Sequence, residues 1–556
     1  MYIGLELTNS EIKLGVINKN KNEINLINFN EDKENHYSIP TIISFYENKK
    51  EVKIGQEAEK ELLKNPTQTI FHIVKFFGKK LKDIKYQNEF LPFKLYSINN
   101  LEDKPYIKIN FGPQKDKIIY FENILSIYLE KVFQNFVHKI KLEENSDNKI
   151  NIAIKTTLLL AVPNYFSFYQ RKLLQTILKT EVIPKINSYM KTNSLKFNFT
   201  LEKIYIKNTS SISSLCLNQN NIKNNISNNF LIMNVDNGSS NISLISLYKE
   251  KNSEKISVKV KESIGMEKGT NDILNDFILY VLKNKIEDKI KKEILNSPTA
   301  LIKIRKIFTK IINDLLKKER TYFNVNEILD KYNIIIEINK TEYEKCLYNY
   351  IYDLKQLLKK LIGNIDINNA DINKIIFIGE FFNDEKIKME LEQFLKEKNL
   401  IFEEILDTYN ENEKLNKEFY SFAGAAYYAL NLKDNNILFQ DISQFNLGFK
   451  AYNGILNYII KKGDLIPLKN IVNIKLAKDS DLELYEIDTQ TKRQKLICKF
   501  NIEQEKILDK NYMDKKLNYR EIKIEYELNE LLNLKLKIIN ENNISKELDF
   551  KLFNYC

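Results

Sequence analysis

Two short stretches of this sequence have the pattern of a strand, a polar turn and a second strand, which is suited to holding a phosphate group. They are Ile3–Val16 (IGLELTNSEIKLGV) and Phe230–Leu247 (FLIMNVDNGSSNISLISL). Apolar residues alternate roughly every second position on both sides of each turn, which predicts two β-hairpins. Successive backbone N–H groups in such a turn can converge on an anion without cationic side chains. The repetition indicates a duplicated phosphate-binding device.

The carboxylates that such a site needs for magnesium are largely missing. Mg²⁺ prefers charged oxygen ligands, and the first hairpin offers Glu6, whereas the second has the neutral amides Asn234 and Asn241. Asp236, in the second turn, is expected to accept local backbone hydrogen bonds rather than to bind a metal. Only 14 of the 556 residues are glycine, against a usual ~7%, so few turns allow a close approach to a ligand. The sequence predicts a nucleotide-binding shape with impaired chemistry.

Length, composition and charge limit the class of protein. A chain of 556 residues, 43% of them hydrophobic, is expected to fold into two to four domains. No stretch approaches ~18 uncharged apolar residues, so no membrane contact is expected, and four widely spaced cysteines favour a cytoplasmic location. The net charge of +11 is compatible with a nearby ribosome. Lys and Asn are nevertheless spread through the whole chain, which favours a compositional bias, and no direct sequence-specific nucleic acid binding is expected.

Two kinds of periodicity divide the chain. Helical spacing of apolar residues predicts helices at Phe121–Leu142, Gln170–Leu178, Ala300–Lys318, Glu342–Ile362 and Lys386–Lys396. Buried strands are predicted at Thr157–Val162 and Lys374–Gly379. From Ile442 onward a two-residue alternation dominates, most clearly in Glu521–Leu528 and Asn533–Ile538, which predicts sheets with one buried face. A domain boundary is therefore expected at about residues 433–442.

Five motifs occur in a characteristic order: KNPTQTIFHIVKFFG (Lys64–Gly78), VPNYFSFYQRKLL (Val162–Leu174), KIIFIG (Lys374–Gly379), FAGAAYYA (Phe422–Ala429) and IIKKGDLIP (Ile459–Pro467). From residue 2 to about residue 540 this order resembles the 70-kDa heat-shock chaperone family. The resemblance implies an α/β actin-like ATPase fold, duplicated and two-lobed, followed by a small all-β sandwich. It implies a nucleotide-binding domain at 1–433, a linker at 434–442 and a peptide-binding-like β-sandwich at 443–556. The helical lid of ordinary members is not expected after the last strand pattern.

The same resemblance indicates which residues would contact ATP. They are Thr8, Asn9, Ser10, Lys75, Asn234, Gly238, Ser239 and Gly379, with Glu6 as the candidate ligand of magnesium. Several of them depart from the family pattern. The first loop of the family begins with Asp, where this chain has Glu6, and both aspartates of the second loop are replaced, by Asn234 and Asn241. The catalytic lysine aligns with Val74, next to Lys75.

Two further departures concern the surroundings of the nucleotide. The acid of the family's Asn-Glu-Pro-Thr segment is replaced by the base Lys207, and Phe381 and Phe382 follow Gly379 where adenosine would lie. Since several chemical positions fail together, we expect a pseudo-ATPase with no catalytic residue. Two alternatives stay open for the cofactor, namely ATP binding without hydrolysis and no ATP binding.

A hydrolysis-deficient member without a lid resembles the Ssz-type subunit of the ribosome-associated complex. This resemblance implies a heterodimer with a J-domain co-chaperone, a peptide segment of that partner held by the β-sandwich, and assistance to nascent chains at the ribosome. Three alternatives remain. They are a divergent ATP-driven foldase that uses Glu6 and Lys75, a nucleotide-exchange factor for a working chaperone, and a peptide-binding module with no nucleotide role.

Overall fold

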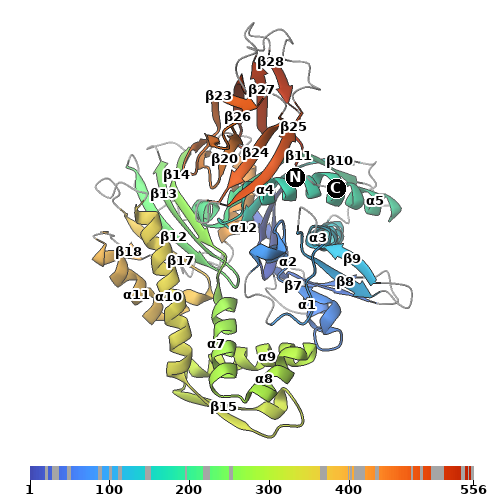
Figure 1. Ribbon diagram of the computed structural model, residues 1–556, viewed down its shortest axis with the longest axis vertical. Coiled ribbons are helices and arrows are strands. Elements are labelled where there is room, and N and C mark those ends of the chain that lie inside the picture. Colours follow the sequence, from blue (N-terminus) through green and yellow to red (C-terminus); the bar gives the residue numbers. More distant parts are fainter. Residues whose placement is uncertain are drawn as a thin grey trace.

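The structure is a computed structural model. It describes the chain except for residues 19–22, 28–36, 47–51, 85–89, 99–102, 111–115, 144–151, 194–196, 217–225, 250–254, 364–371, 399, 401–403, 406–419, 432–436, 478–479, 489–492, 502–518, 540–544, 549 and 553–556. Two large sheets with flanking helices lie side by side, and two smaller sheets stand above them (Figure 1).

The first large sheet begins with the first predicted hairpin. Its strands are β1 (Tyr2–Leu7), β2 (Glu11–Asn18), β3 (Glu23–Leu26), β4 (Ser38–Pro40), β10 (Ile152–Val162) and β11 (Phe197–Asn208). The strand order is β11-β10-β1-β2-β3, and β4 pairs with β2. Strands β1, β10 and β11 run parallel, whereas β2 is antiparallel to β1 with Ile3 opposite Val16. The first hairpin prediction is therefore confirmed.

The second large sheet repeats this topology. Its strands are β12 (Asn228–Val235), β13 (Ser240–Lys249), β14 (Ile256–Met266), β17 (Lys374–Ile378), β18 (Glu404–Ile405), β19 (Ile437–Ile442) and β22 (Leu465–Ile466). Five of them follow the order β18-β17-β12-β13-β14, with the same parallel and antiparallel pairs as in the first sheet. The second hairpin prediction is confirmed as well, since β12 pairs with β13. The turns of both hairpins consequently occupy equivalent places.

Helices accompany both large sheets. The first half of the chain has α1 (Gly55–Glu59), α2 (Ile73–Phe76), α3 (Phe121–Glu143), α4 (Phe168–Ile177) and α5 (Ile183–Thr192). The helices α6 (Thr209–Ser213) and α12 (Tyr420–Asn431) contact each other, α6 against both large sheets and α12 against the first. The second half has α7 (Thr270–Asn284), α8 (Asp288–Asn296), α9 (Pro298–Leu315), α10 (Lys340–Gly363) and α11 (Glu385–Glu397), of which α7–α9 pack on one another below the sheet (Figure 1). The predicted helices at 121–142, 170–178, 300–318, 342–362 and 386–396 are confirmed within a few residues. Small sheets complete these parts, with strands β5 (Ile42–Phe45), β6 (Val52–Ile54), β7 (Thr69–Phe71), β8 (Tyr106–Asn110), β9 (Asp116–Tyr120), β15 (Arg320–Asn324) and β16 (Ile335–Asn339).

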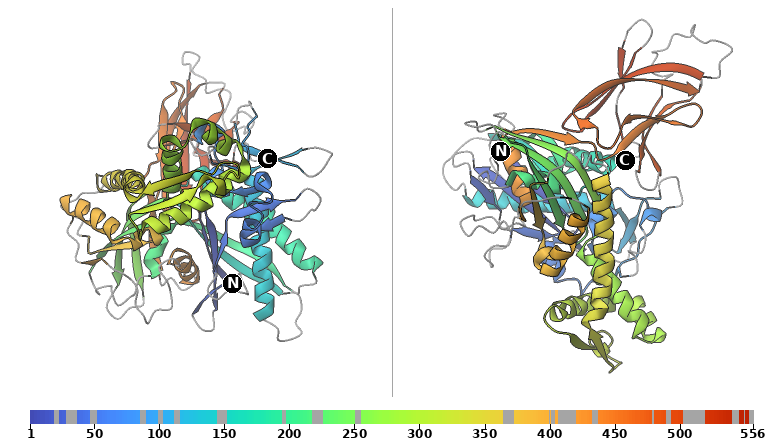
Figure 2. Two further views of the ribbon diagram at one scale, coloured as in Figure 1. Left: turned by 90° about the horizontal axis from the view of Figure 1, so that it is seen from below. Right: turned by 90° about the vertical axis from the view of Figure 1, so that its left-hand side faces the viewer.

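The carboxy-terminal part forms a β-sandwich, which is seen at the top in Figures 1 and 2. One sheet has the order β21-β20-β24-β25 and the other β23-β26-β27-β28. The strands are β20 (Asn446–Lys450), β21 (Leu456–Ile460), β23 (Leu468–Ala477), β24 (Leu482–Ile487), β25 (Gln494–Phe500), β26 (Tyr519–Leu528), β27 (Leu534–Ile539) and β28 (Ser545–Leu548). The strand pair predicted at 521–528 and 533–538 is confirmed, because β26 pairs with β27.

The hydrophobic core is continuous between the first sheet and the sandwich. Leu5 and Leu160 of the first sheet, Phe168 of α4, and Leu484 and Ile524 of the sandwich belong to one cluster of buried side chains. One face of the second sheet and helices α7–α11 form a second cluster. The other face of this sheet shares a third cluster with Leu159 and Ala161 of the first sheet. Within the described residues, no helix combines the length and apolar character needed to span a membrane. Residues 434–436 of the predicted linker lie outside the described residues.

Candidate nucleotide cleft

A cavity of about 1030 Å³ opens where the turns of the two hairpins approach each other. Its wall also includes the ends of α7, α9 and α10 and the segment after β17. Five of the nine residues predicted to bind nucleotide or metal line it, namely Glu6, Thr8, Ser10, Asn234 and Gly379. The other four, Asn9, Lys75, Gly238 and Ser239, do not line the cavity. The assignment of these residues to ATP stays a prediction.

The turn of the first hairpin satisfies its own backbone donors. The N–H groups of Ser10 and Glu11 both donate to Oγ1 of Thr8, at 3.3 and 3.1 Å. The Thr8 hydroxyl in turn donates to the Glu11 carbonyl at 2.9 Å, and the Thr8 N–H donates to the same oxygen at 3.0 Å. The turn is therefore compact, and the Thr8 hydroxyl oxygen accepts the two N–H groups that an external anion would otherwise need.

The turn of the second hairpin contains its own anion. The N–H groups of Gly238 and Ser239 both donate to Oδ1 of Asp236 at 2.7 Å, and the Ser239 hydroxyl donates to Oδ2 at 2.7 Å. The turn-forming role predicted for Asp236 is therefore confirmed. Burial raises the pKa of Asp236, although these three hydrogen bonds oppose the shift. The donors that could hold a phosphate are already used by this carboxyl group.

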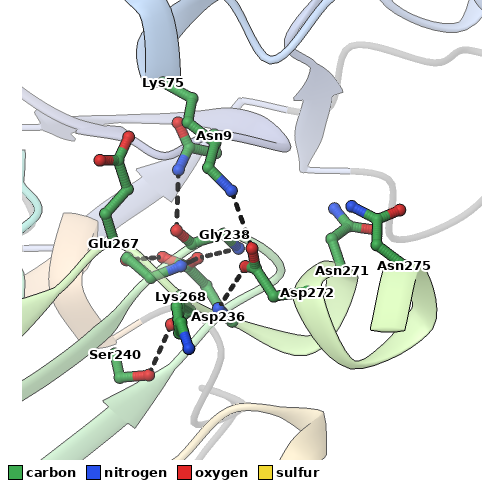
Figure 3. Close-up of polar contacts among 12 residues, drawn as sticks. Asn9, Lys75, Asp236, Gly238, Ser240, Glu267, Lys268, Asn271, Asp272 and Asn275 are labelled. Carbon is green, nitrogen blue, oxygen red and sulfur yellow. Dashed lines mark hydrogen bonds and ion pairs between the residues drawn. The ribbon is translucent and has the colours of Figure 1, made fainter. Parts of the chain in front are cut away.

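The two hairpins touch each other directly through Asn9 (Figure 3). The Asn9 amide donates to the Gly238 carbonyl at 2.9 Å, and it also reaches the Tyr165 hydroxyl at 3.3 Å. A Cβ atom at position 238 would lie 2.5 Å from the Asn9 amide nitrogen, so this contact requires glycine. Asn9 is only 1% exposed. Its side chain thus fills the space between the two turns.

A lysine makes the next bridge between the two halves. Lys75, on α2, is 4% exposed, and its Nζ atom lies 3.0 Å from Oδ1 of Asp272 in the first turn of α7. Oδ2 of Asp272 accepts the N–H of Gly269 at 2.8 Å and so caps that helix. Close by, Lys79 forms an ion pair with Glu267. Lys75 is therefore directed to α7 rather than to the cavity (Figure 3).

Glu6 lies at the end of β1, where the resemblance places a metal-binding carboxylate. It lines the cavity but is 4% exposed, and its Oε2 atom has no hydrogen-bond partner. The nearest cation is Lys13, whose Nζ lies 3.7 Å from Oε2 and 2.7 Å from the carboxylate of Glu11. Burial raises the pKa of Glu6, and Lys13 opposes this shift.

The amides of the second hairpin have structural contacts. Asn241 is fully buried, and its Oδ1 atom accepts the N–H of Asn164 at 2.8 Å, while its Nδ2 donates to the Ser239 hydroxyl at 2.9 Å. Asn164 also donates to the hydroxyls of Ser210 and Ser263 at 2.7 and 2.9 Å. Position 241, where the resemblance places an aspartate, is thus part of a buried network of neutral groups.

These residues do not fit magnesium with a triphosphate. The turn donors are bonded to Thr8 and Asp236, and Lys75 is paired with Asp272. The cavity wall adds eight acidic residues against three lysines, namely Glu6, Glu11, Asp236, Glu344, Glu380, Asp384, Glu385 and Glu390 against Lys13, Lys340 and Lys386. Such a surface opposes a polyanion. Among the described residues, no group of three or more His, Cys, Asp or Glu is arranged to hold a metal ion.

The far end of the cavity is less obstructed than the sequence suggested. Gly379 has a φ of +108°, and a Cβ atom there would lie 2.1 Å from the Val235 carbonyl, so only glycine fits. Phe381 lines the cavity, but Phe382 is 2% exposed and packs on Phe377, with ring centroids 4.6 Å apart. The expectation that both phenylalanines fill an adenosine position is therefore wrong for Phe382, because its ring turns into the core.

Comparisons with known proteins agree with this architecture. The family described as Hsp70 protein matches residues 2–179. Heat shock cognate 70 kDa protein 3 of Dictyostelium discoideum is 22% identical over 479 residues, which cover 83% of this chain and 68% of that protein. Heat shock 70 kDa protein of Trichophyton rubrum is 20% identical over 514 residues, or 90% and 70% of the two chains. Chaperone protein HscA of Buchnera aphidicola subsp. Schizaphis graminum is 24% identical over 467 residues, or 81% and 63%.

The chain is therefore similar to Hsp70 proteins along more than four-fifths of its length, at 20–24% identity to the relatives above. The match to the Hsp70 protein family covers residues 2–179, which include the first hairpin and helix α4.

Sequence reasoning missed the partners of the candidate residues. Asp272 follows Gly269 by three positions, a spacing typical of a helix start, and this pattern indicates α7. No local pattern connects Asp272 to Lys75, which lies almost two hundred residues earlier in the chain. Only the meeting of the two halves brings these side chains together.

Proposed function

We propose that this protein is a hydrolysis-deficient Hsp70-type chaperone subunit that pairs with a J-domain co-chaperone and assists nascent chains at the ribosome. In this proposal the two repeated sheets form an actin-like nucleotide-binding fold that has lost its chemistry, as in the Ssz-type subunit. The partner, the cytoplasmic location and the net charge of +11 near a ribosome are parts of the same proposal.

One observation carries the loss of hydrolysis, namely the state of Asn241. Phosphoryl transfer to water needs a group that orients the attacking water and a metal that neutralises developing charge. Asn241 carries no charge, it is 0% exposed, and its two polar atoms are bonded to Asn164 and Ser239. It is therefore unable to act on a water molecule in the cavity.

The β-sandwich supplies a surface for a peptide segment of the partner. Tyr452, Ile455, Tyr458 and Ile471 are large apolar residues with exposed fractions of 48, 61, 40 and 48%. The N–H of Tyr452 donates to the Lys475 carbonyl of β23 at 2.8 Å, which joins the β20–β21 connection to the strand that carries Ile471. An extended peptide can bury apolar side chains on such a surface.

The first test is recovery of the intact protein from extract of its own cells, followed by mass spectrometry and a sucrose gradient. We expect a J-domain protein in near-equal amount, sedimenting with ribosomes. The double variant Ile455→Ser, Ile471→Ser should lose that protein, whereas Leu63→Ser, a change at a 41% exposed residue of the first half, should retain it. A spread of unfolded clients that ATP releases would contradict the proposal and would favour the foldase alternative.

The second test measures steady-state ATP hydrolysis by the purified protein. We expect no turnover above that of a matched Glu6→Ala variant, since the residue of the second hairpin that corresponds to Glu6 is the neutral Asn234. Turnover that disappears in Glu6→Ala would instead identify an active ATPase. The Glu344→Ala variant, a change in another acidic residue of the cavity wall, controls for a general effect of charge.

A further inference from the structure

The strand that leads into the sandwich is built into the second sheet. β19 runs parallel to β14, with residues Ile437 to Gln440 opposite Ile256 to Lys259. Its last two residues pair with β22, Asp441 opposite Ile466 and Ile442 opposite Leu465. β19 is thus hydrogen-bonded on both sides, to the sheet on one edge and to the start of the sandwich on the other.

A buried ion pair links this strand to the first sheet. Lys207 is the penultimate residue of β11, and its Nζ atom lies 3.0 Å from Oδ2 of Asp441. The two residues are 2% and 8% exposed. The other carboxylate oxygen, Oδ1, accepts the N–H of Ile442 at 2.9 Å. The Lys207 ammonium also lies 4.9 Å from the ring centroid of Phe439 on the same strand. One side chain therefore contacts β19 at two residues.

The sign of the charge at position 207 decides what this contact does. The resemblance places an acid there, and an acid would face the Asp441 carboxylate as a like charge in a buried place. In this chain a base stands opposite Asp441 instead. If β19 moved away from β11, both charges would lose their partner, and a buried charge without a partner is costly. The pair therefore strongly disfavours any arrangement in which β19 separates from β11 of the first sheet.

We propose that the Lys207–Asp441 ion pair fastens β19, so that the β-sandwich stays docked on the first sheet without any requirement for nucleotide. The inference rests on contacts within this chain and does not depend on the proposed partner. In this inference Lys207 is a positioning residue, which holds β19 through Asp441.

The docked face is consistent with a permanent interface. The Glu486 carboxylate of β24 accepts the N–H groups of Phe168 and Tyr169 at the start of α4, at 2.6 and 3.0 Å. Lys495 of β25 donates to the Gly78 carbonyl at 2.7 Å, and its Nζ lies 3.4 Å from the ring centroid of Tyr169. Two charged side chains of the sandwich therefore form hydrogen bonds with the backbone of the first half of the protein.

Side-chain contacts beside the cavity also join the two halves of the protein without a nucleotide. Asn9 joins the hairpin turns, and Lys75 and Lys79 bridge to the second half through Asp272 and Glu267. Bonds within the chain thus hold the two halves together at the place where a nucleotide would otherwise have to connect them.

Hydrogen exchange of the backbone amides of β19, followed by mass spectrometry of the intact protein, tests the proposal. The wild type should show the same slow exchange with and without millimolar MgATP. In Lys207→Glu the β19 amides should exchange about tenfold faster or more, because two carboxylates then meet. The combined variant Lys207→Asp, Asp441→Lys should regain protection, since it restores a pair of opposite charges.

The matched control is Lys469→Glu. This change breaks an ion pair with Glu525 on the surface of the sandwich, where the Lys469 side chain is 61% exposed. Its β19 amides should exchange as in the wild type. Amides of β12 and β13 report whether each variant is folded. Should Lys207→Glu fail to fold, Lys207→Met, which removes the charge without repulsion, is expected to show faster exchange confined to β19.

Two results would overturn the proposal. One is wild-type exchange at β19 in the folded Lys207→Glu or Lys207→Met variant. The other is a wild-type protein whose β19 amides change their exchange rate about tenfold with MgATP. Neither result bears on ATP hydrolysis or on the J-domain partner, so a failure of this inference and a failure of the proposed function are distinguishable.

Discussion

At the scale of single residues, Asp236 supplies an internal acceptor for the turn of the second hairpin. Three donors, the N–H groups of Gly238 and Ser239 and the hydroxyl of Ser239, converge on its carboxyl group. A phosphate oxygen would need the same donors in the same directions. The carboxyl group is attached to the chain, so it competes with any external anion at a very high local concentration.

This argument predicts a gain of anion binding in Asp236→Gly, which restores the glycine of the family loop. The variant should lose about 2 kcal/mol of unfolding free energy, because charge-assisted hydrogen bonds are removed. It should also bind inorganic phosphate or ADP measurably by calorimetric titration, whereas the wild type should not. Asp330→Gly, at a side chain that is 90% exposed, should change neither property. If Asp236→Gly binds neither phosphate nor ADP, the Asp236 carboxyl group is not what keeps an anion out of this turn.

Glu6 gives a prediction on pH, because burial raises its pKa above the usual value of 4.5. The folded protein then holds a proton at Glu6 under conditions in which the unfolded chain releases it. The stability from the neutral carboxyl group is fully present below the unfolded pKa, and it is lost as the pH rises through the folded pKa. Glutamine imitates the neutral form at every pH.

Glu6→Gln should consequently be more stable than the wild type at about pH 8, by about 1 kcal/mol or more, and the difference should vanish near pH 4. Lys13 keeps Glu11 as its partner, at 2.7 Å, so the variant leaves no isolated charge. Urea unfolding at the two pH values measures both differences. Greater stability of the wild type at the higher pH would mean that Glu6 is ionised and stabilising there.

At the scale of elements, helix α4 depends on a residue from the sandwich. Ser167 caps this helix by accepting the N–H of Gln170, as its sequence indicates. The N–H groups of Phe168 and Tyr169 instead bind Glu486, more than three hundred residues later. A carboxylate at this end of a helix is also favoured by the helix dipole. The start of α4 is thus completed only when the sandwich is docked.

Glu486→Ala should therefore lower the unfolding free energy by about 2–3 kcal/mol, since two helix donors lose their acceptor in a buried place. Glu521→Ala is the matched change in the same sandwich, at a side chain that is 64% exposed and 3.4 Å from the Lys475 ammonium, and it should have almost no effect. Urea unfolding followed by circular dichroism compares the two. Equal effects of both variants would show that the α4 contact adds nothing.

The elements also show how far local sequence reasoning reaches. The two hairpins, helix α10 and the β26–β27 pair could be predicted because periodicity and turn residues act over short distances. The bonds of Asn9, Lys75 and Lys207 could not be predicted, because each joins segments that meet only in the folded protein. Substitutions at Asn234 and Asn241 indicated lost chemistry, but only the structure shows that Asn241 is bound to Asn164.

At the scale of the whole molecule, the arrangement of cores has a thermodynamic consequence. Side chains of the first sheet and of the sandwich form one continuous cluster, with Phe168 between them and 4.8 Å from the ring of Phe445. Parts that share a core and several buried polar contacts are expected to unfold together. A separately moving sandwich would instead give a transition of its own.

Scanning calorimetry should therefore show one transition for the first sheet and the sandwich in the wild type. A second transition should separate in Lys207→Glu, where β19 is released. A nucleotide present at 100 times its Kd would add ~2.7 kcal/mol to the folded state and raise the Tm by several degrees. Because the turn donors are already bonded to Thr8 and Asp236, we expect millimolar MgATP to shift the wild-type Tm by less than about 1 °C. A larger shift would show that MgATP displaces the internal contacts, and the cleft would then be a working nucleotide site in spite of its lost carboxylates.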